Sequence, residues 1–135
     1  MEPAPVQVTT PISNKNVSAP ALRTAFRILD AWGLGNKEQM TLLGNPPRST
    51  FYRWKHGESV ALAQDTLERL SYIFGIYSAL QVLLPKPESA DTWIKKPNAT
   101  PIFGGHSALQ RMLSGHVADL YVVRQYLDAQ RGGWA

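Results

Sequence analysis

The sequence predicts an all-helical fold, in which an N-terminal helix-turn-helix bundle is followed by a small helical C-terminal domain. Apolar residues recur every three or four positions through most of the chain, which is the spacing of one face of a helix. No segment shows the alternation of apolar and polar residues that is typical of a half-buried strand. Glycines and prolines fall between the periodic segments, where helices begin and end.

Size and composition limit the classes of protein that the chain can belong to. With 135 residues, 44% of them hydrophobic and 18% charged, it can bury a core as one domain or two small ones. The net charge of +4 favours a polyanionic partner. The absence of cysteine excludes disulfides and zinc-finger sites. No apolar run is long enough to span a membrane and no signal peptide is apparent, so we expect a cytoplasmic protein.

The first periodic segment follows an irregular start. Residues 1–19 hold three prolines among threonine, serine and asparagine, and we predict a flexible arm there. From Ala21 a helix is expected on the apolar spacing of Leu22, Ala25, Phe26, Leu29 and Trp32. Gly33 and Gly35 are expected to end it.

A short second helix is predicted from Lys37 to Leu43. Asn36 followed three residues later by Gln39 has the pattern of a reciprocal N-terminal cap. Gly44 is expected to form the turn after this helix.

The next segment, from Pro47 to Gly57, carries the strongest functional signal. Proline is favoured in a first helical turn, so a third helix is expected to open near Pro47 and to end at Gly57. Phe51 and Trp54 lie three positions apart, and we assign them to packing. The other side chains can contact phosphates or base edges, and they are Arg48, Ser49, Thr50, Tyr52, Arg53 and Lys55. The two short helices therefore predict a helix-turn-helix that places its second helix in a DNA major groove.

Short helix pairs also occur in proteins that never contact DNA. The pattern of charges is what favours DNA binding over a purely structural helix pair here. Between Arg48 and Lys55 there are three cations and no acid. A few phosphate contacts give weak binding at cellular salt, so a homodimer that reads two half-sites of operator DNA is expected.

A long amphipathic helix is predicted from Gln64 to Leu84, with Pro85 and Pro87 after it. Its wide apolar stripe is assigned to the intramolecular core rather than to a dimer interface, and consists of Leu67, Leu70, Ile73, Phe74, Tyr77, Leu80, Leu83 and Leu84. We place a helix-turn-helix domain at residues 20–85 and a second domain at residues 86–135.

The second domain is expected to contain three shorter helices. The first is predicted around Asp91 to Lys95, before an irregular passage from Pro97 to Gly105. Ser107 is expected to cap the second, which Gly115 ends. The last helix is predicted from Val117 to Gln130.

No pattern in the chain predicts catalysis, a cofactor or a metal site. His56, His106 and His116 lack the spacing of metal ligands on one helical face. The pair Gly104-Gly105 lacks the lysine and the spacing of a phosphate-binding loop, so we interpret it as a tight turn that docks Phe103 into the core.

Three sequence patterns in the C-terminal half carry a family resemblance. They are W-x-x-x-P-N from Trp93, F-G-G-H-S-A-L-x-x-M-L-S-G from Phe103, and V-x-x-Y-L-x-A-x-x-G-G-W from Val123. This part of the chain resembles the C-terminal domain of the MbcA/ParS/Xre-type antitoxins, the partners of RES-domain toxins. Such antitoxins carry an Xre-like helix-turn-helix upstream, so the resemblance extends from about Ala21 to the end. Ala108 departs from the pattern, since the family often has proline there.

The resemblance implies a type II toxin-antitoxin system. The chain would be a non-enzymatic antitoxin that binds and blocks an NAD-consuming RES-domain toxin and represses its own operon, as a homodimer within a hetero-oligomer. We expect the end of the last helix and the tail to plug the toxin's nucleotide cleft through Asp128, Arg131, Gly132, Gly133, Trp134 and Ala135. The alternatives are a frayed tail, or a helix-turn-helix regulator whose C-terminal module only dimerises or senses a ligand.

Overall fold

The computed structural model describes residues 11–58 and 60–132, and every regular element within them is a helix. In chain order these elements are α2 (Pro11–Ala31), α3 (Asn36–Leu42), α4 (Arg48–Lys55), α5 (Gln64–Leu83), α6 (Pro87–Thr92), the short 3-10 helix η1 (Trp93–Lys95), α7 (Ala108–Met112) and α8 (Val117–Gln130). The predicted all-helical class is confirmed.

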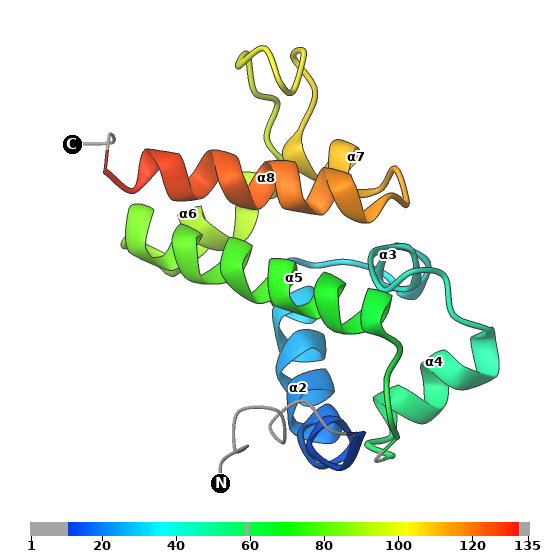
Figure 1. Cartoon of the computed structure of the whole chain (residues 1–135). Coiled ribbons are helices and arrows are strands. Elements are labelled where there is room, and N and C mark those ends of the chain that lie inside the picture. Colours follow the sequence, from blue (N-terminus) through cyan, green and yellow to red (C-terminus); the bar gives the residue numbers. More distant parts are fainter. Residues whose placement is uncertain (1–10, 59, 133–135) are drawn as a thin grey trace, which may run out of the picture.

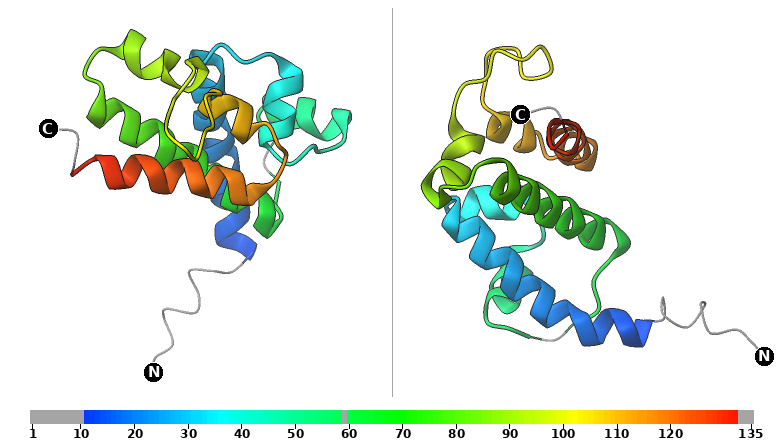
Figure 2. Two further views of the ribbon diagram at one scale, coloured as in Figure 1. Left: turned by 90° about the horizontal axis from the view of Figure 1, so that it is seen from above. Right: turned by 90° about the vertical axis from the view of Figure 1, so that its left-hand side faces the viewer.

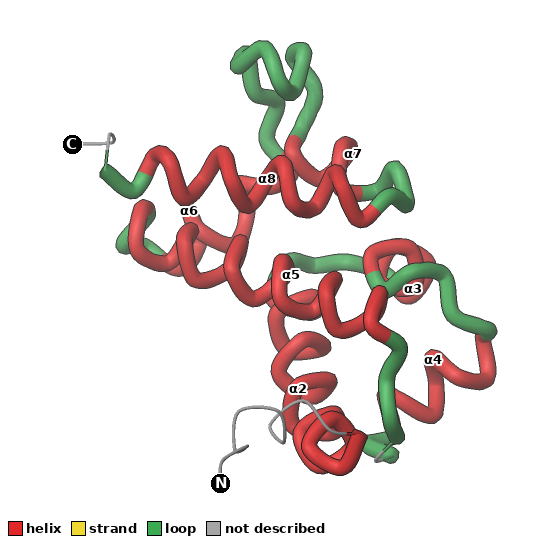
Figure 3. Tube along the Cα trace, in the orientation of Figure 1, coloured by secondary structure: helices red, strands yellow, loops and turns green. Residues whose placement is uncertain are grey.

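Helix α5 lies at the centre of the molecule. Helix α8 runs alongside it on one side, and α2 crosses it on the other, so that the three helices form successive layers (Figures 1 and 2). Helices α3 and α4 lie beyond the N-terminal end of α5, and the long loop between η1 and α7 projects outward past α8 (Figure 3).

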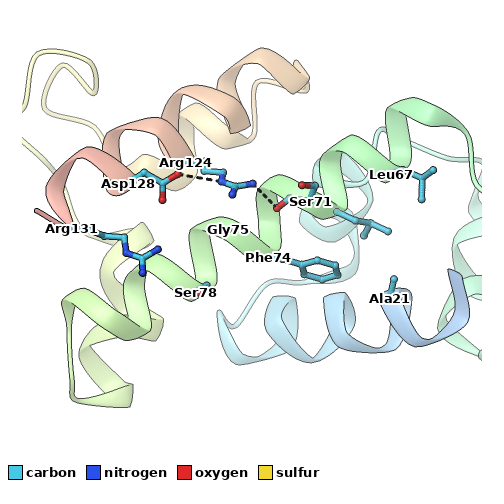
Figure 4. A pocket seen from close by; sticks show the side chains of 10 residues that line it. Ala21, Leu67, Ser71, Phe74, Gly75, Ser78, Arg124, Asp128 and Arg131 are labelled. Atoms are coloured by element: carbon cyan, nitrogen blue, oxygen red, sulfur yellow. Dashed lines mark hydrogen bonds and ion pairs between the residues drawn. The ribbon is translucent and has the colours of Figure 1, made fainter. Parts of the chain in front are cut away.

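The contact between α5 and α8 joins the two halves of the chain into one core. The buried apolar side chains of α2, α3, α4, α5, α7 and α8 belong to a single cluster. Gly75 lies where α5 and α8 approach closely, because a Cβ atom there would collide with the guanidinium group of Arg124. Because glycine has no Cβ atom, Arg124 can lie across α5, and it donates to the carbonyl of Ser71 at 3.4 Å (Figure 4).

A buried arginine adds a polar connection between the halves. The Arg69 side chain is 8% exposed, and its Nε donates to Asp65 at 2.8 Å. Its Nη2 donates to the carbonyl of Gly115, between α7 and α8, at 2.9 Å, and its Nη1 lies 3.5 Å from the carbonyl of Leu42 in α3. Arg69 therefore links the helix-turn-helix to the turn that precedes α8.

The N-terminal arm is shorter than the sequence indicated. The predicted irregular arm is wrong for residues 11–19, which form the first turns of α2, whereas residues 1–10 lie outside the described chain. Pro11 suits a first helical turn, and Pro20 removes only one hydrogen bond from the helix. Ser18 is fully buried, so this extension packs against the rest of the protein.

Two predicted helix starts also differ. Helix α3 is capped one residue earlier than expected, because the Gly35 amide donates to the carboxylate of Glu38 at 3.1 Å and Gln39 is buried instead. The helix predicted around Asp91 to Lys95 begins at Pro87, which occupies a first-turn position rather than only ending α5.

The predicted turn and cap before α7 are confirmed. The hydroxyl of Ser107 accepts a hydrogen bond from the Gln110 amide at 3.0 Å. Phe103 is buried, and its ring contacts those of Trp93 and Tyr126 with centroids 6.1 and 5.3 Å apart. This aromatic cluster attaches the projecting loop to α8.

A charged network holds the same loop against the start of α8. Arg111 donates to Asp119 at 2.8 Å and to the carbonyl of Ile102 at 2.6 Å, and the Ser114 hydroxyl donates to Asp119 at 2.6 Å. The Ser114 hydrogen bond, and after it the Arg111 guanidinium, hold the pKa of Asp119 below its usual value against the opposing effect of burial.

This pKa shift leads to a prediction about acid stability. Because the pKa of Asp119 is lower in the folded than in the unfolded protein, its contribution is complete above the unfolded pKa and disappears as the pH falls through the folded one. Between about pH 5 and pH 3 the free energy of unfolding should fall more steeply for the wild type than for Asp119→Asn. Urea titrations across this range measure the difference, with the exposed Asp128→Asn as control. Parallel curves for the wild type and Asp119→Asn would contradict it.

Candidate functional site

The α3–α4 pair is built as a helix-turn-helix anchored by aromatic side chains. The turn uses Gly44 and Asn45 with φ of +95° and +55°, a region that favours glycine and tolerates asparagine. On α4, Phe51 and Trp54 are buried, as the sequence predicted. The Phe51 ring meets that of Phe26 in α2 edge to face, with centroids 5.7 Å apart. One side of α4 is thus fixed to the core.

The opposite side of α4 is open to solvent. At about 100° per residue, Ser49, Arg53 and His56 lie opposite Phe51 and Trp54, and all three are exposed. His56 was not among the predicted DNA-binding residues, although the helical period that places Ser49 and Arg53 together also includes it. We call Ser49, Arg53 and His56 the outward row of α4.

The α3-facing flank of α4 carries the next three candidates. The Arg48 guanidinium lies 5.5 Å from the ring centroid of Tyr52, whose hydroxyl accepts from Asn36 at 3.1 Å. The Lys55 ammonium donates to Asn36 at 3.1 Å and lies 5.3 Å from the ring centroid of Phe26. Arg48 is exposed, whereas Tyr52 and Lys55 are half-buried and tied to α3.

The remaining candidate, Thr50, lies on the flank of α4 that faces away from α3. It is half-buried and lines a hollow there together with Arg53, Trp54 and Val60. The structure therefore brings five of the six predicted side chains to the outward row or to the α3 side, and places Thr50 beside Arg53 on the other flank.

An acid for which the sequence predicted only a surface position lies beside the outward row. Glu58 accepts from Arg53 at 3.0 Å, and both side chains are about half exposed. Arg53 therefore has a carboxylate partner that an incoming phosphate would have to replace.

The end of α8 holds the described members of the predicted tail site. Asp128 is exposed and accepts from Arg124 at 3.4 Å, and Arg131 and Gly132 are also exposed. Gly133, Trp134 and Ala135 lie outside the described residues.

The outer face of α8 is an additional surface that the sequence did not indicate. Ile102 from the projecting loop is 37% exposed, and Tyr121 on α8 is 44% exposed. Ile102, Val122 and Tyr126 line a shallow hollow of about 420 Å³. We call this surface, made of Ile102, Tyr121, Val122, Gln125, Tyr126 and Ala129, the outer face of α8. It contains no charged residue, which is the composition expected at the centre of a protein interface.

The two candidate surfaces are well separated. Helix α4 and the C-terminal end of α8 lie at opposite ends of the molecule (Figures 1 and 2). Across the described ranges, no helix combines the length and the hydropathy needed to cross a membrane.

Comparison with known proteins matches the chain to two family models. Residues 15–75 match the model of the antitoxin Xre-like helix-turn-helix domain, and residues 79–133 match that of the antitoxin Xre/MbcA/ParS C-terminal toxin-binding domain. The chain is 49% identical over 129 residues to the uncharacterized protein y4oB of Sinorhizobium fredii (strain NBRC 101917 / NGR234). The aligned residues cover 96% of this chain and 98% of that protein. No solved structure matches the chain.

Proposed function

The chain belongs to the Xre/MbcA/ParS family of antitoxins, and we propose that it blocks an NAD-consuming RES-domain toxin and represses its own operon. The observation that carries the proposal is the separation of two surfaces on one core: the cationic side of α4 at one end and the end of α8 at the other. Each surface can then bind its own partner. Neither binding event requires the chain to catalyse a reaction.

The DNA-binding part of the proposal rests on α4. Arg48 and Arg53 are exposed, and either guanidinium can approach a guanine edge or a phosphate. Ser49 and His56 stand beside Arg53 and can donate to phosphate or to a base edge. Lys55, held by Asn36, is better placed to support the helix pair than to reach a base.

The toxin-binding part rests on α8 and on the C-terminal tail. The uncharged outer face of α8 offers an apolar contact area, and the same helix leads directly to Arg131 and the tail. We propose that this face holds the toxin while the tail, with Trp134, enters the nucleotide cleft. An aromatic ring can stack there in place of a base.

A homodimer is part of the same proposal. One copy makes few phosphate contacts, so useful specificity requires two copies of α4 at half-sites about one helical turn apart.

The direct test is co-expression with the protein encoded by the adjacent gene. The proposal expects the two proteins to co-purify in a fixed ratio, and NAD consumption by the partner to stop when the chain is present. A homodimer that binds operator DNA but retains no partner would instead support the plain transcriptional regulator.

The Arg53–Glu58 ion pair gives a prediction about DNA affinity. Replacing Glu58 with glutamine should raise the affinity for operator DNA up to about fivefold, because the carboxylate no longer competes with phosphate and exposed ion pairs contribute at most about 1 kcal/mol. Fluorescence anisotropy at two salt concentrations measures the change. Glu88→Gln in the first turn of α6 removes the same charge far from α4 and should have no effect. Unchanged or weaker binding by Glu58→Gln would show that Glu58 positions Arg53 for DNA rather than competing with it.

A further inference from the structure

A hollow of about 390 Å³ lies between α4 and residues 60–63, on the flank of α4 that faces away from α3. Most of the side chains that line it are apolar, among them the half-buried Pro46 and Val60 and the buried Trp54. Of the described residues that line the hollow, only Arg53 is charged. The hollow is therefore an apolar site directly beside an arginine of the outward row.

Thr50 lies at the boundary between this hollow and the outward row. At about 100° per residue, it lies on the circumference of α4 between Arg53 and the buried Trp54. It belongs to the first turn of α4, and recognition helices contact base edges with their N-terminal residues. Thr50 and Arg53 are about 4.5 Å apart along the helix axis, close to the roughly 3.4 Å between successive base pairs. The two side chains can therefore meet neighbouring base pairs.

The apolar wall limits which group of DNA fits the hollow. A phosphate or a hydrogen-bonding base edge would lose its water partners against proline, valine and tryptophan side chains without gaining new ones. The 5-methyl group of thymine is the apolar group that base pairs present in the major groove, and the methyl group of threonine is a common contact for it. The half-buried Thr50 carries such a methyl group at the edge of the hollow.

We propose that the hollow receives the 5-methyl group of a thymine next to the base pair that Arg53 contacts. Thr50 and Val60 then determine specificity at this thymine, and Val60 contributes although it lies outside α4. The inference rests on the proposed DNA-binding function and adds one base to what α4 reads. Burying one methyl group corresponds to about a fourfold change in affinity at each half-site, or about 15-fold for a dimer on two half-sites.

Replacing thymine with deoxyuridine tests the proposal, because the two bases differ only in the methyl group. Operator sequences are first selected from random duplexes with the full chain and again with Arg53→Ala, which identifies the base pair that depends on Arg53. We expect deoxyuridine at the neighbouring thymine of both half-sites to weaken binding by the wild type about 15-fold. Deoxyuridine at other thymines should change the affinity less than about twofold. Fluorescence anisotropy measures each affinity.

Two variants of the hollow identify the side chains that contact the methyl group. Thr50→Ser keeps the hydroxyl and removes the methyl group, and Val60→Ala shortens the opposite wall. Each should reduce the difference between thymine and deoxyuridine. The matched controls are Thr92→Ser at the end of α6 and Val82→Ala near the end of α5 away from α4, both exposed, and they should keep the full difference (Figure 1).

Three outcomes would overturn the proposal while leaving operator binding in place. Equal affinity for thymine and deoxyuridine at every position would show that no methyl group is read. A sensitive thymine that does not adjoin the base pair of Arg53 would place the contact elsewhere on the protein. A difference that persists in full in both Thr50→Ser and Val60→Ala would exclude the hollow. If no sequence is selected at all, the proposed DNA-binding function fails, and this inference fails with it.

Discussion

Replacing Arg48 and Arg53 together with alanine is expected to abolish operator binding while leaving inhibition of the toxin unchanged. An arginine that binds a guanine edge contributes about 1–3 kcal/mol of discrimination, so losing two should weaken each half-site by at least about 30-fold. If they contact phosphates instead, the salt slope should fall by roughly 0.9 for each lost contact. The loss of Arg53 also leaves Glu58 unpaired, and its carboxylate would then repel the DNA backbone.

The fold should survive this double substitution. Both arginines are exposed, and the Arg53–Glu58 pair is a surface ion pair of the kind that contributes less than about 1 kcal/mol to stability. Electrophoretic mobility shifts measure operator binding, and toxin turnover of NAD measures neutralisation. The matched control is Lys86→Ala/Lys96→Ala, which removes two exposed charges from the C-terminal half. Full operator affinity in the double variant would remove α4 from the DNA interface, and loss of both activities would indicate misfolding.

Deleting Gly132 to Ala135 is expected to restore toxin activity within an intact complex. If the tail fills the nucleotide cleft, its removal opens the cleft while the outer face of α8 still holds the toxin. A buried tryptophan at an interface commonly contributes about 2 kcal/mol or more, so the complex should weaken by about 30-fold. NAD turnover at protein concentrations above the dissociation constant measures the release, and size-exclusion chromatography confirms that the complex persists.

A second tail variant separates the aromatic ring from chain length. Trp134→Ser keeps the length of the tail, and should restore toxin turnover nearly as well as the deletion if the indole occupies the base position. Inhibition that is unchanged by the deletion would refute the plug and leave the outer face of α8 as the inhibitory element. Loss of the complex on deletion would show instead that the tail supplies most of the affinity.

The sequence predicted the elements whose signals are local. Helices α4, α5 and α8 follow from apolar spacing and from glycine or proline at their ends, and Phe51 and Trp54 are buried as expected. The first turns of α2 were missed because their prolines and polar residues carry no helical period, whereas the burial of Ser18 depends on tertiary packing.

The candidate surfaces were only partly predictable for the same reason. The helical period places Ser49 and Arg53 on one side of α4, but the partners Asn36 and Glu58 lie outside that helix and depend on how it docks. The link from Arg69 to Gly115 spans 46 positions and has no local signature. The outer face of α8 likewise requires the loop that brings Ile102 beside it.

The central claim is that one core presents two independent surfaces, and hydrogen exchange of the full chain with each partner tests it most directly. Operator DNA is expected to slow exchange of the amides in residues 48–57, and the toxin to slow exchange in residues 117–132, each without protecting the other segment. Protection of α4 by the toxin, or of α8 by operator DNA, would contradict the claim. It would show that the two partners bind one surface, or that binding at one surface changes the structure of the other.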